Sequence, residues 1–165
     1  MIAVLNANRM LVNTDVEPAN SENQTNIAAS AEDLLAEIKS KKFDQNAQDS
    51  VVLIPSQFTS SHPTNFLGPE AGTERDSCVL PDSGDYRSLY RYNDIDDYNG
   101  YVRIDTTSMM TGFRDSVVVY YVSESNPDTK VNTQTFFKRI DITVTHPSMK
   151  KPLKLSDVAV YRKFF

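Results

Sequence analysis

The sequence predicts a mixed α+β fold in which one N-terminal helix packs against an antiparallel sheet of about four strands. Two observations support this prediction. Residues 25–43 carry apolar side chains at the spacing of one helix face, and the C-terminal half contains β-branched and aromatic runs separated by turn residues. A helix with one apolar stripe needs a partner surface, and the predicted sheet is the only large one that the sequence offers.

The predicted helix, residues 25–43, organises the rest of the fold. Its apolar stripe follows the spacing i, i+4, i+7, i+8 and i+11 and consists of Ile27, Ala31, Leu34, Leu35 and Ile38. The opposite face carries Ser30, Glu37 and Lys41 and is predicted to face solvent. Glu37 and Lys41 also have the i,i+4 order that favours a helix.

The chain on either side of this helix is predicted to be less regular. Residues 1–24 are interpreted as an N-terminal segment and linker, and residues 25–165 as a single domain. Residues 50–54, SVVLI, are predicted to form a short buried strand that ends at a proline. Residues 57–84 contain three prolines and three glycines, which predicts a long loop at the surface.

Three further strands are predicted at residues 115–122, 135–145 and 153–165. The middle one alternates most clearly, with Ile140, Ile142 and Val144 on one face and polar residues on the other. This alternation is typical of a sheet with one face on the core and one face in water.

Composition and charge exclude several classes of protein. The net charge of −5 argues against a nucleic-acid binder that depends on phosphate contacts, and the single cysteine allows no internal disulfide. No stretch reaches the roughly 18 apolar residues of a membrane-spanning helix.

His62 and His146 lie in predicted turns without a cysteine cluster, which argues against a zinc site. Because no phosphate loop and no set of acid, base and nucleophile stands out, we expect no enzyme and no cofactor other than calcium.

The acidic loop 93–100, NDIDDYNG, is the strongest candidate site. Asp94, Asp96 and Asp97, with neighbouring amides, offer hard oxygen ligands of the kind that calcium prefers. The spacing does not match an EF-hand loop, so a solvated turn is the alternative interpretation. The surrounding segment 85–101 is rich in tyrosine, which makes it a possible binding surface for a glycan or a surface partner.

Several stretches also carry a family resemblance. They are IAASAEDLLAEIKSKKFD (27–44), LGPEAGTERD (67–76) with YNDIDDYNGY (92–101), and FKRIDITVTHP (137–147) with LSDVAVYRKF (155–164). Together they resemble the exposed end of the helix, the loop and the closing strands of type IV pilin-like proteins. The resemblance is to minor pilins and pseudopilins of the MSHA minor-pilin kind in particular.

The resemblance implies a structural subunit of a type IV pilus-like filament or secretion pseudopilus, located in the cell envelope or outside the cell. The implied partners are other pilin-like subunits or a small helix-bearing chain. Members of that family begin with a processed leader and an apolar helix, and residues 1–24 as given show neither feature. Membrane association is therefore expected only through a missing or separate N-terminal helix, joined at residues 1–12. An extracellular binding module that uses segment 85–101 is the alternative function.

Overall fold

The computed structural model describes residues 21–47, 51–60, 67–75, 78–84, 86–106 and 111–162. The helices and helical turns are α1 (Ser21–Ser40), η2 (Gln45–Ala47), η3 (Pro55–Gln57), α2 (Ser88–Arg91) and η4 (Asp96–Tyr98). The strands are β1 (Asp82–Ser83), β2 (Val102–Ile104), β3 (Arg114–Tyr121), β4 (Phe137–Thr145) and β5 (Leu153–Val160). Residues 1–20 of the predicted N-terminal segment lie outside the described residues, and residues 21–24 belong to α1.

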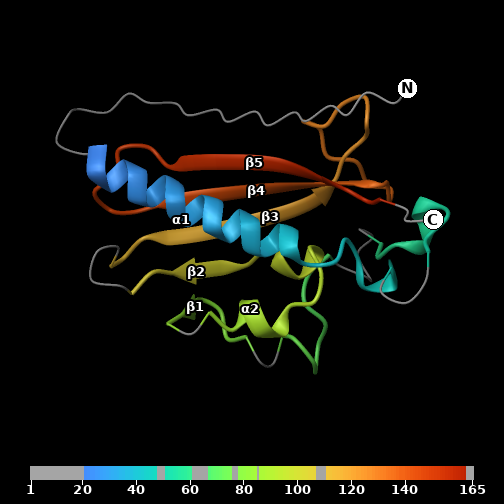
Figure 1. The fold of residues 1–165 in the computed structure, drawn as a ribbon, viewed down its shortest axis with the longest axis horizontal. Coiled ribbons are helices and arrows are strands. Elements are labelled where there is room, and N and C mark those ends of the chain that lie inside the picture. The colour runs from blue at the N-terminus through green and yellow to red at the C-terminus, as the bar shows by residue number, and fades with distance from the viewer. Residues whose placement is uncertain are drawn as a thin grey trace.

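The five strands form one mixed sheet in the order β1-β2-β3-β4-β5 (Figure 1). β1 pairs with β2 in parallel, and each of the other neighbours pairs antiparallel. The protein therefore has the mixed α+β class that its sequence predicts. Neither β1 nor β2 was predicted, because they have only two and three residues and are too short to produce an alternating pattern.

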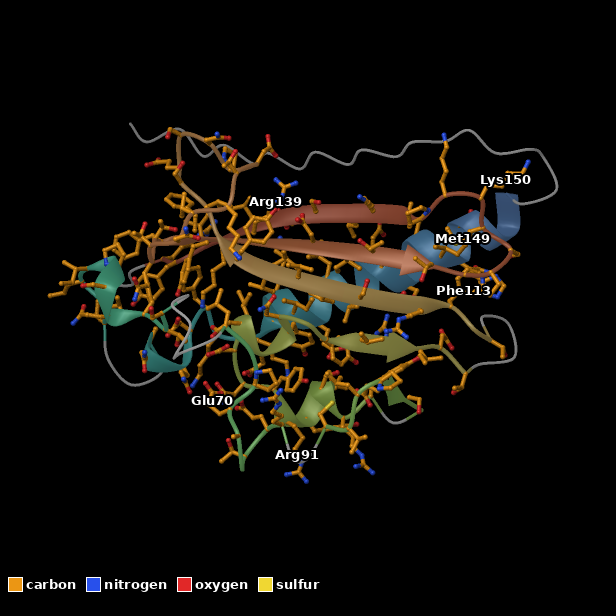
Figure 2. All side chains as sticks on the ribbon, turned by 180° about the vertical axis from the view of Figure 1, so that it is seen from behind. Glu70, Arg91, Phe113, Arg139, Met149 and Lys150 are labelled. Carbon is orange, nitrogen blue, oxygen red and sulfur yellow. The ribbon has the colours of Figure 1, made fainter. Side chains whose placement is uncertain are left out.

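The buried core joins α1 to the central strands. Ile27, Ala31, Leu34 and Ile38 of α1 are at most 5% exposed. They belong to one cluster with inward residues of β3 and β4, which are Val117, Val119, Ile140, Ile142 and Val144. In Figure 1, α1 runs along one face of the sheet, and Arg139 marks the opposite, more polar face in Figure 2. Leu35 is half-buried at the border of this cluster.

The face of α1 that was predicted to meet water is partly covered. The side chain of Glu37 is only 10% exposed, and its Oε1 accepts a hydrogen bond from the hydroxyl of Tyr98 at 2.6 Å. The backbone carbonyl of Ser30 accepts a hydrogen bond from Arg103 at 3.0 Å. The prediction is wrong at these positions because segment 86–105 folds back against this flank of the helix.

Segment 50–54 does not form the predicted strand. Residues 51–54 have no regular structure, and Val52 alone is buried, whereas Leu53 and Ile54 are 61% and 57% exposed. The backbone N–H groups of Leu53 and Ile54 donate to the side-chain carbonyl of Gln57. A local side-chain acceptor thus replaces the strand partner that the apolar run led us to expect.

The long loop 57–84 lies partly inside the protein in its described parts. Phe58 and Leu67 belong to a second buried cluster, with Val52 and Tyr121, and Glu74 and Cys78 are also buried. The proline- and glycine-rich sequence predicted a surface loop, but these buried side chains pack the loop against the rest of the protein.

None of the described helices combines the length and apolar character needed to cross a membrane.

Candidate functional site

The acidic loop is buried, which the solvated-turn interpretation did not anticipate. Asp94, Asp96 and Asp97 have exposed fractions of 1%, 0% and 1%. The loop lies between Lys138 of β4 and the segment 67–75. As a result, the three carboxylates that the sequence grouped together have different partners.

Asp96 takes part in a buried ion-pair network around Lys138. The Nζ of Lys138 lies 2.6 Å from Asp96 Oδ1 and 3.0 Å from Asp44 Oδ2, and it donates to the carbonyl of Phe43 at 2.7 Å. The rings of Phe43 and Tyr121 lie 4.6 and 5.3 Å from this ammonium group. Burial would lower the pKa of Lys138, but the carboxylates of Asp96 and Asp44 raise it above the ordinary value. The lysine is therefore a buried cation that links three segments of the chain.

The alternation of β4 contained a signal for this network. Lys138 has the same parity as the inward residues Ile140, Ile142 and Val144, and it is fully buried. A lysine at an inward strand position requires buried acceptors, and acidic residues elsewhere in the chain are the natural candidates. Neither Lys138 nor its partner Asp44 was among the predicted site residues.

Asp94 has a structural role at the start of η4. Its Oδ1 accepts hydrogen bonds from the backbone N–H groups of Asp96 and Asp97 at 2.9 and 3.3 Å. Its Oδ2 accepts one from the N–H of Gln45, which joins the loop to the segment after α1. Burial, followed by the charge of Asp96, raises the pKa of Asp94. Both carboxylate oxygens are thus already engaged with the backbone.

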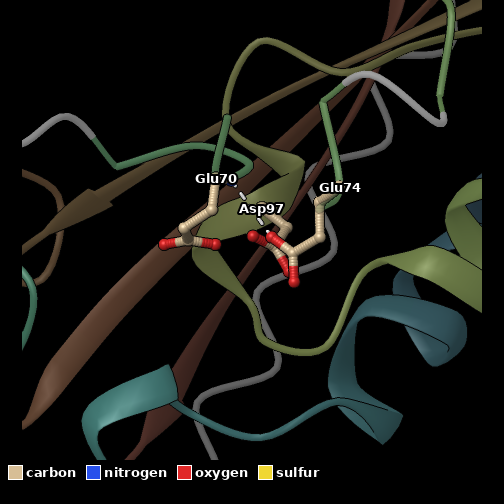
Figure 3. A group of neighbouring side chains, drawn as sticks. All are labelled: Glu70, Glu74 and Asp97. Carbon is tan, nitrogen blue, oxygen red and sulfur yellow. Dashed lines mark hydrogen bonds between the residues drawn. The ribbon is translucent and has the colours of Figure 1, made fainter. Parts of the chain in front are cut away.

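Asp97 belongs to a second carboxylate group with Glu70 and Glu74. One oxygen from each residue lies within 4.8 Å of the others, and Figure 3 shows the three side chains pointing toward one another. It is the metal-compatible group of three or more ligands found among the described residues. Of the predicted trio, only Asp97 takes part. Glu70 and Glu74 were missed, although their i,i+4 spacing in the loop PEAGTE was visible in the sequence.

The hydrogen bonds around this group fix its orientation. Asp97 Oδ2 accepts the backbone N–H groups of Asn93 and Asp94 at 2.7 and 3.0 Å. Glu74 Oε2 accepts the N–H of Glu70 at 3.1 Å, and Glu74 Oε1 accepts the side-chain amide of Asn93. No described residue donates a hydrogen bond to Asp97 Oδ1 or to Glu70 Oε2.

Burial changes the acid–base properties of the group. It raises the pKa of Glu74 to about 7, and the hydrogen bond with the side chain of Glu70 raises it further. Burial likewise raises the pKa of Asp97 to about 7. The hydrogen bond from the backbone N–H of Asp94 has the opposite effect and lowers this pKa, because it favours the ionised form. Glu74 and Asp97 therefore exchange protons near neutral pH, well above the range of an ordinary carboxyl group.

The tyrosines of segment 85–101 lie mostly inside the protein. Tyr92, Tyr98 and Tyr101 are at most 3% exposed, and their rings meet edge-on with centroids 4.9 to 5.8 Å apart. The hydroxyl of Tyr101 donates to Asp82 at 3.0 Å. Tyr90, in contrast, is 77% exposed. These rings stabilise the core and are not displayed as a stacking surface.

The remaining candidates have simple structural settings. His146 stacks on Phe113 with ring centroids 4.3 Å apart, and its Nδ1 lies 2.6 Å from Ser148 Oγ. Cys78 is buried, and burial raises the pKa of its thiol. His62 lies outside the described residues.

The fold and the site together define a mixed α+β protein with a buried lysine network and a separate carboxylate group. No protein-family model, curated protein or solved structure matches the chain. Its function is therefore inferred from its own residues and geometry.

Proposed function

We propose that the chain is a structural subunit of a type IV pilus-like filament or secretion pseudopilus in the bacterial envelope. It would work through contacts with other pilin-like subunits or with a small helix-bearing chain. The proposal rests on the family resemblance of the sequence and on one structural observation, which is that only one face of α1 is buried.

That observation is the one-sided burial of α1. Ile27, Leu34 and Ile38 pack into the cluster that contains the inward residues of β3 and β4. Along the same helix, Glu32, Asp33 and neighbouring positions remain exposed. Because the sheet covers only one face of α1, the exposed face can contact neighbouring subunits while the buried face stays in the core of its own subunit.

The order of elements along the chain supports the same proposal. Segment 41–101 separates α1 from β2, and β2 to β5 then follow as a simple antiparallel meander. This arrangement agrees with the helix, loop and closing strands to which the quoted motifs bear a resemblance.

A binding module that uses segment 85–101 has less support. Its three central tyrosines are buried, and the hydroxyls of Tyr98 and Tyr101 are hydrogen-bonded within the protein, so the rings do not form an exposed platform for a sugar. A surface partner would instead meet exposed residues such as Tyr90 and Leu89.

Assembly with and without an added apolar helix tests the proposal. The 165-residue chain is compared with the same chain preceded by an apolar helix of about 20 residues, long enough to span a bilayer. A third version carries a polar helix of equal length as the control. Sedimentation velocity at micromolar concentration and electron microscopy are the measurements.

We expect the chain alone and the polar control to be monomeric, and the version with the apolar helix to form filaments of uniform width. Ordered filaments from the chain alone would show that assembly does not depend on such a helix. If the apolar version gives only monomers or amorphous aggregates, the filament function is wrong.

A further inference from the structure

We propose that Glu70, Glu74 and Asp97 bind a calcium ion that holds segment 67–75 against segment 93–99. This site differs from the Asp94, Asp96 and Asp97 group that the sequence suggested. It also stands apart from the proposed filament function, because a subunit of any class can be stabilised in this way.

The spacing of the carboxylates fits calcium. Oxygens bind calcium at about 2.3–2.6 Å, so two ligands on opposite sides of the ion lie about 4.6–5.2 Å apart. One oxygen from each of the three residues lies within 4.8 Å of the others. The ion can therefore reach all three carboxylates without a large movement of the backbone.

The unpartnered oxygen of Asp97 is the second, independent observation. This residue is 1% exposed, and its Oδ2 is held by two backbone N–H groups, which fixes the carboxylate plane. No described residue donates a hydrogen bond to its Oδ1. Figure 3 shows the side chain of Asp97 pointing toward those of Glu70 and Glu74. A buried acceptor without a partner is costly, and a cation would satisfy it.

Hydrogen bonds outside the group prepare the site for an ion. Asn93 donates its backbone N–H to Asp97 and its side-chain amide to Glu74, so one residue orients two ligands. The side-chain amide of Asn99 donates to the carbonyl of Leu67 at 2.8 Å. The two segments that supply the ligands are thus already joined on both sides of the group, and such outer contacts typically strengthen metal binding.

The chemistry of the ligands favours calcium over other common ions. All three side chains supply oxygen, whereas structural zinc sites are built from sulfur and nitrogen ligands. Magnesium requires near-ideal octahedral geometry at about 2.0–2.1 Å and keeps most of its water, whereas calcium accepts irregular sites in loops. Glu70 is half-buried, so the ion has a route from solvent.

Calorimetric titration of the full chain with calcium chloride, after treatment with a chelator, tests the proposal. Thermal melting is the second measurement. We expect one calcium ion per chain and a rise in Tm of about 5–10 °C at a calcium concentration 100 times Kd. Glu70→Gln should weaken binding about tenfold or more, because it removes one charged ligand from the most accessible position.

Two variants serve as controls. Glu32→Gln neutralises an exposed carboxylate of α1 and should bind calcium like the wild type. Asp96→Asn weakens the Lys138 network, so its basal Tm should fall, but its rise with calcium should persist. Absence of binding heat and of a Tm shift up to millimolar calcium in the wild type would overturn the proposal. Unchanged affinity in Glu70→Gln, or loss of the response in Asp96→Asn alone, would overturn the proposed ligand set.

Discussion

At the scale of single residues, the main finding is that charged side chains of the loops and of α1 are structural. Glu37 is the clearest case, because its helical position predicted exposure and its side chain is instead 10% exposed. Its Oε1 accepts hydrogen bonds from the hydroxyls of Tyr98 and Ser88 at 2.6 and 2.9 Å. Glu37 thus satisfies polar groups that segment 86–105 brings against the helix.

Removal of the Glu37 carboxylate is expected to be costly. Glu37→Ala leaves the buried hydroxyl of Tyr98 without its acceptor, whereas Ser88 can still donate to the hydroxyl of Tyr101. The loss should lower the free energy of unfolding by about 1–3 kcal/mol. Glu32→Ala, on the exposed side of the same helix, should leave stability near that of the wild type. Urea unfolding followed by circular dichroism measures both, and equal stabilities would contradict the structural role of Glu37.

At the scale of elements, α1 and the long strands were predictable, and the short elements were not. The i,i+4 stripe of α1 and the alternation of β4 are strong periodic signals, because they repeat over several turns or residues. In contrast, β1 has two residues, and the apolar run at 51–54 is diverted by the side chain of Gln57. The carboxylate group combines loops distant in sequence, so no local pattern could show that Glu70 meets Asp97.

The two neighbouring leucines of α1 should differ in their contribution to stability. Leu34 is fully buried in the main cluster, whereas Leu35 is half-buried beside it. We expect Leu34→Ala to lower the free energy of unfolding by about 2–5 kcal/mol and Leu35→Ala by about 1 kcal/mol. Thermal melts of the two variants provide the measurement. Equal losses would mean that the helix is rotated relative to the described orientation.

At the scale of the whole molecule, the buried carboxyl groups should make stability depend on pH in an unusual direction. Burial raises the pKa values of Glu74 and Asp97 to about 7 and also raises those of Asp94 and Asp115. In the unfolded chain such groups ionise near pH 4. Between about pH 5 and pH 8 the native state therefore binds more protons, and the free energy of unfolding falls as pH rises.

The expected result is a Tm of the calcium-free protein that decreases from pH 5 to pH 8. Glu74→Gln should reduce the slope, whereas the exposed Glu124→Gln should leave it unchanged. Calcium should also reduce the slope, because the ion stabilises the ionised carboxylates of Glu70, Glu74 and Asp97. A calcium-free Tm that rises over this range would show that these groups are already ionised without cost.

The contacts of Lys138 also determine the order in which the molecule can form. This residue joins β4 to Phe43, 95 residues earlier, and to Asp96, 42 residues earlier. The apolar stripe of α1 is made first by the ribosome, yet its partners in β4 are made near the end. Such long-range closures slow folding and leave apolar surface open to aggregation in the meantime. The apolar face of α1 therefore has no partner in β4 during most of synthesis, and this interval is when we expect the chain to be most prone to aggregation.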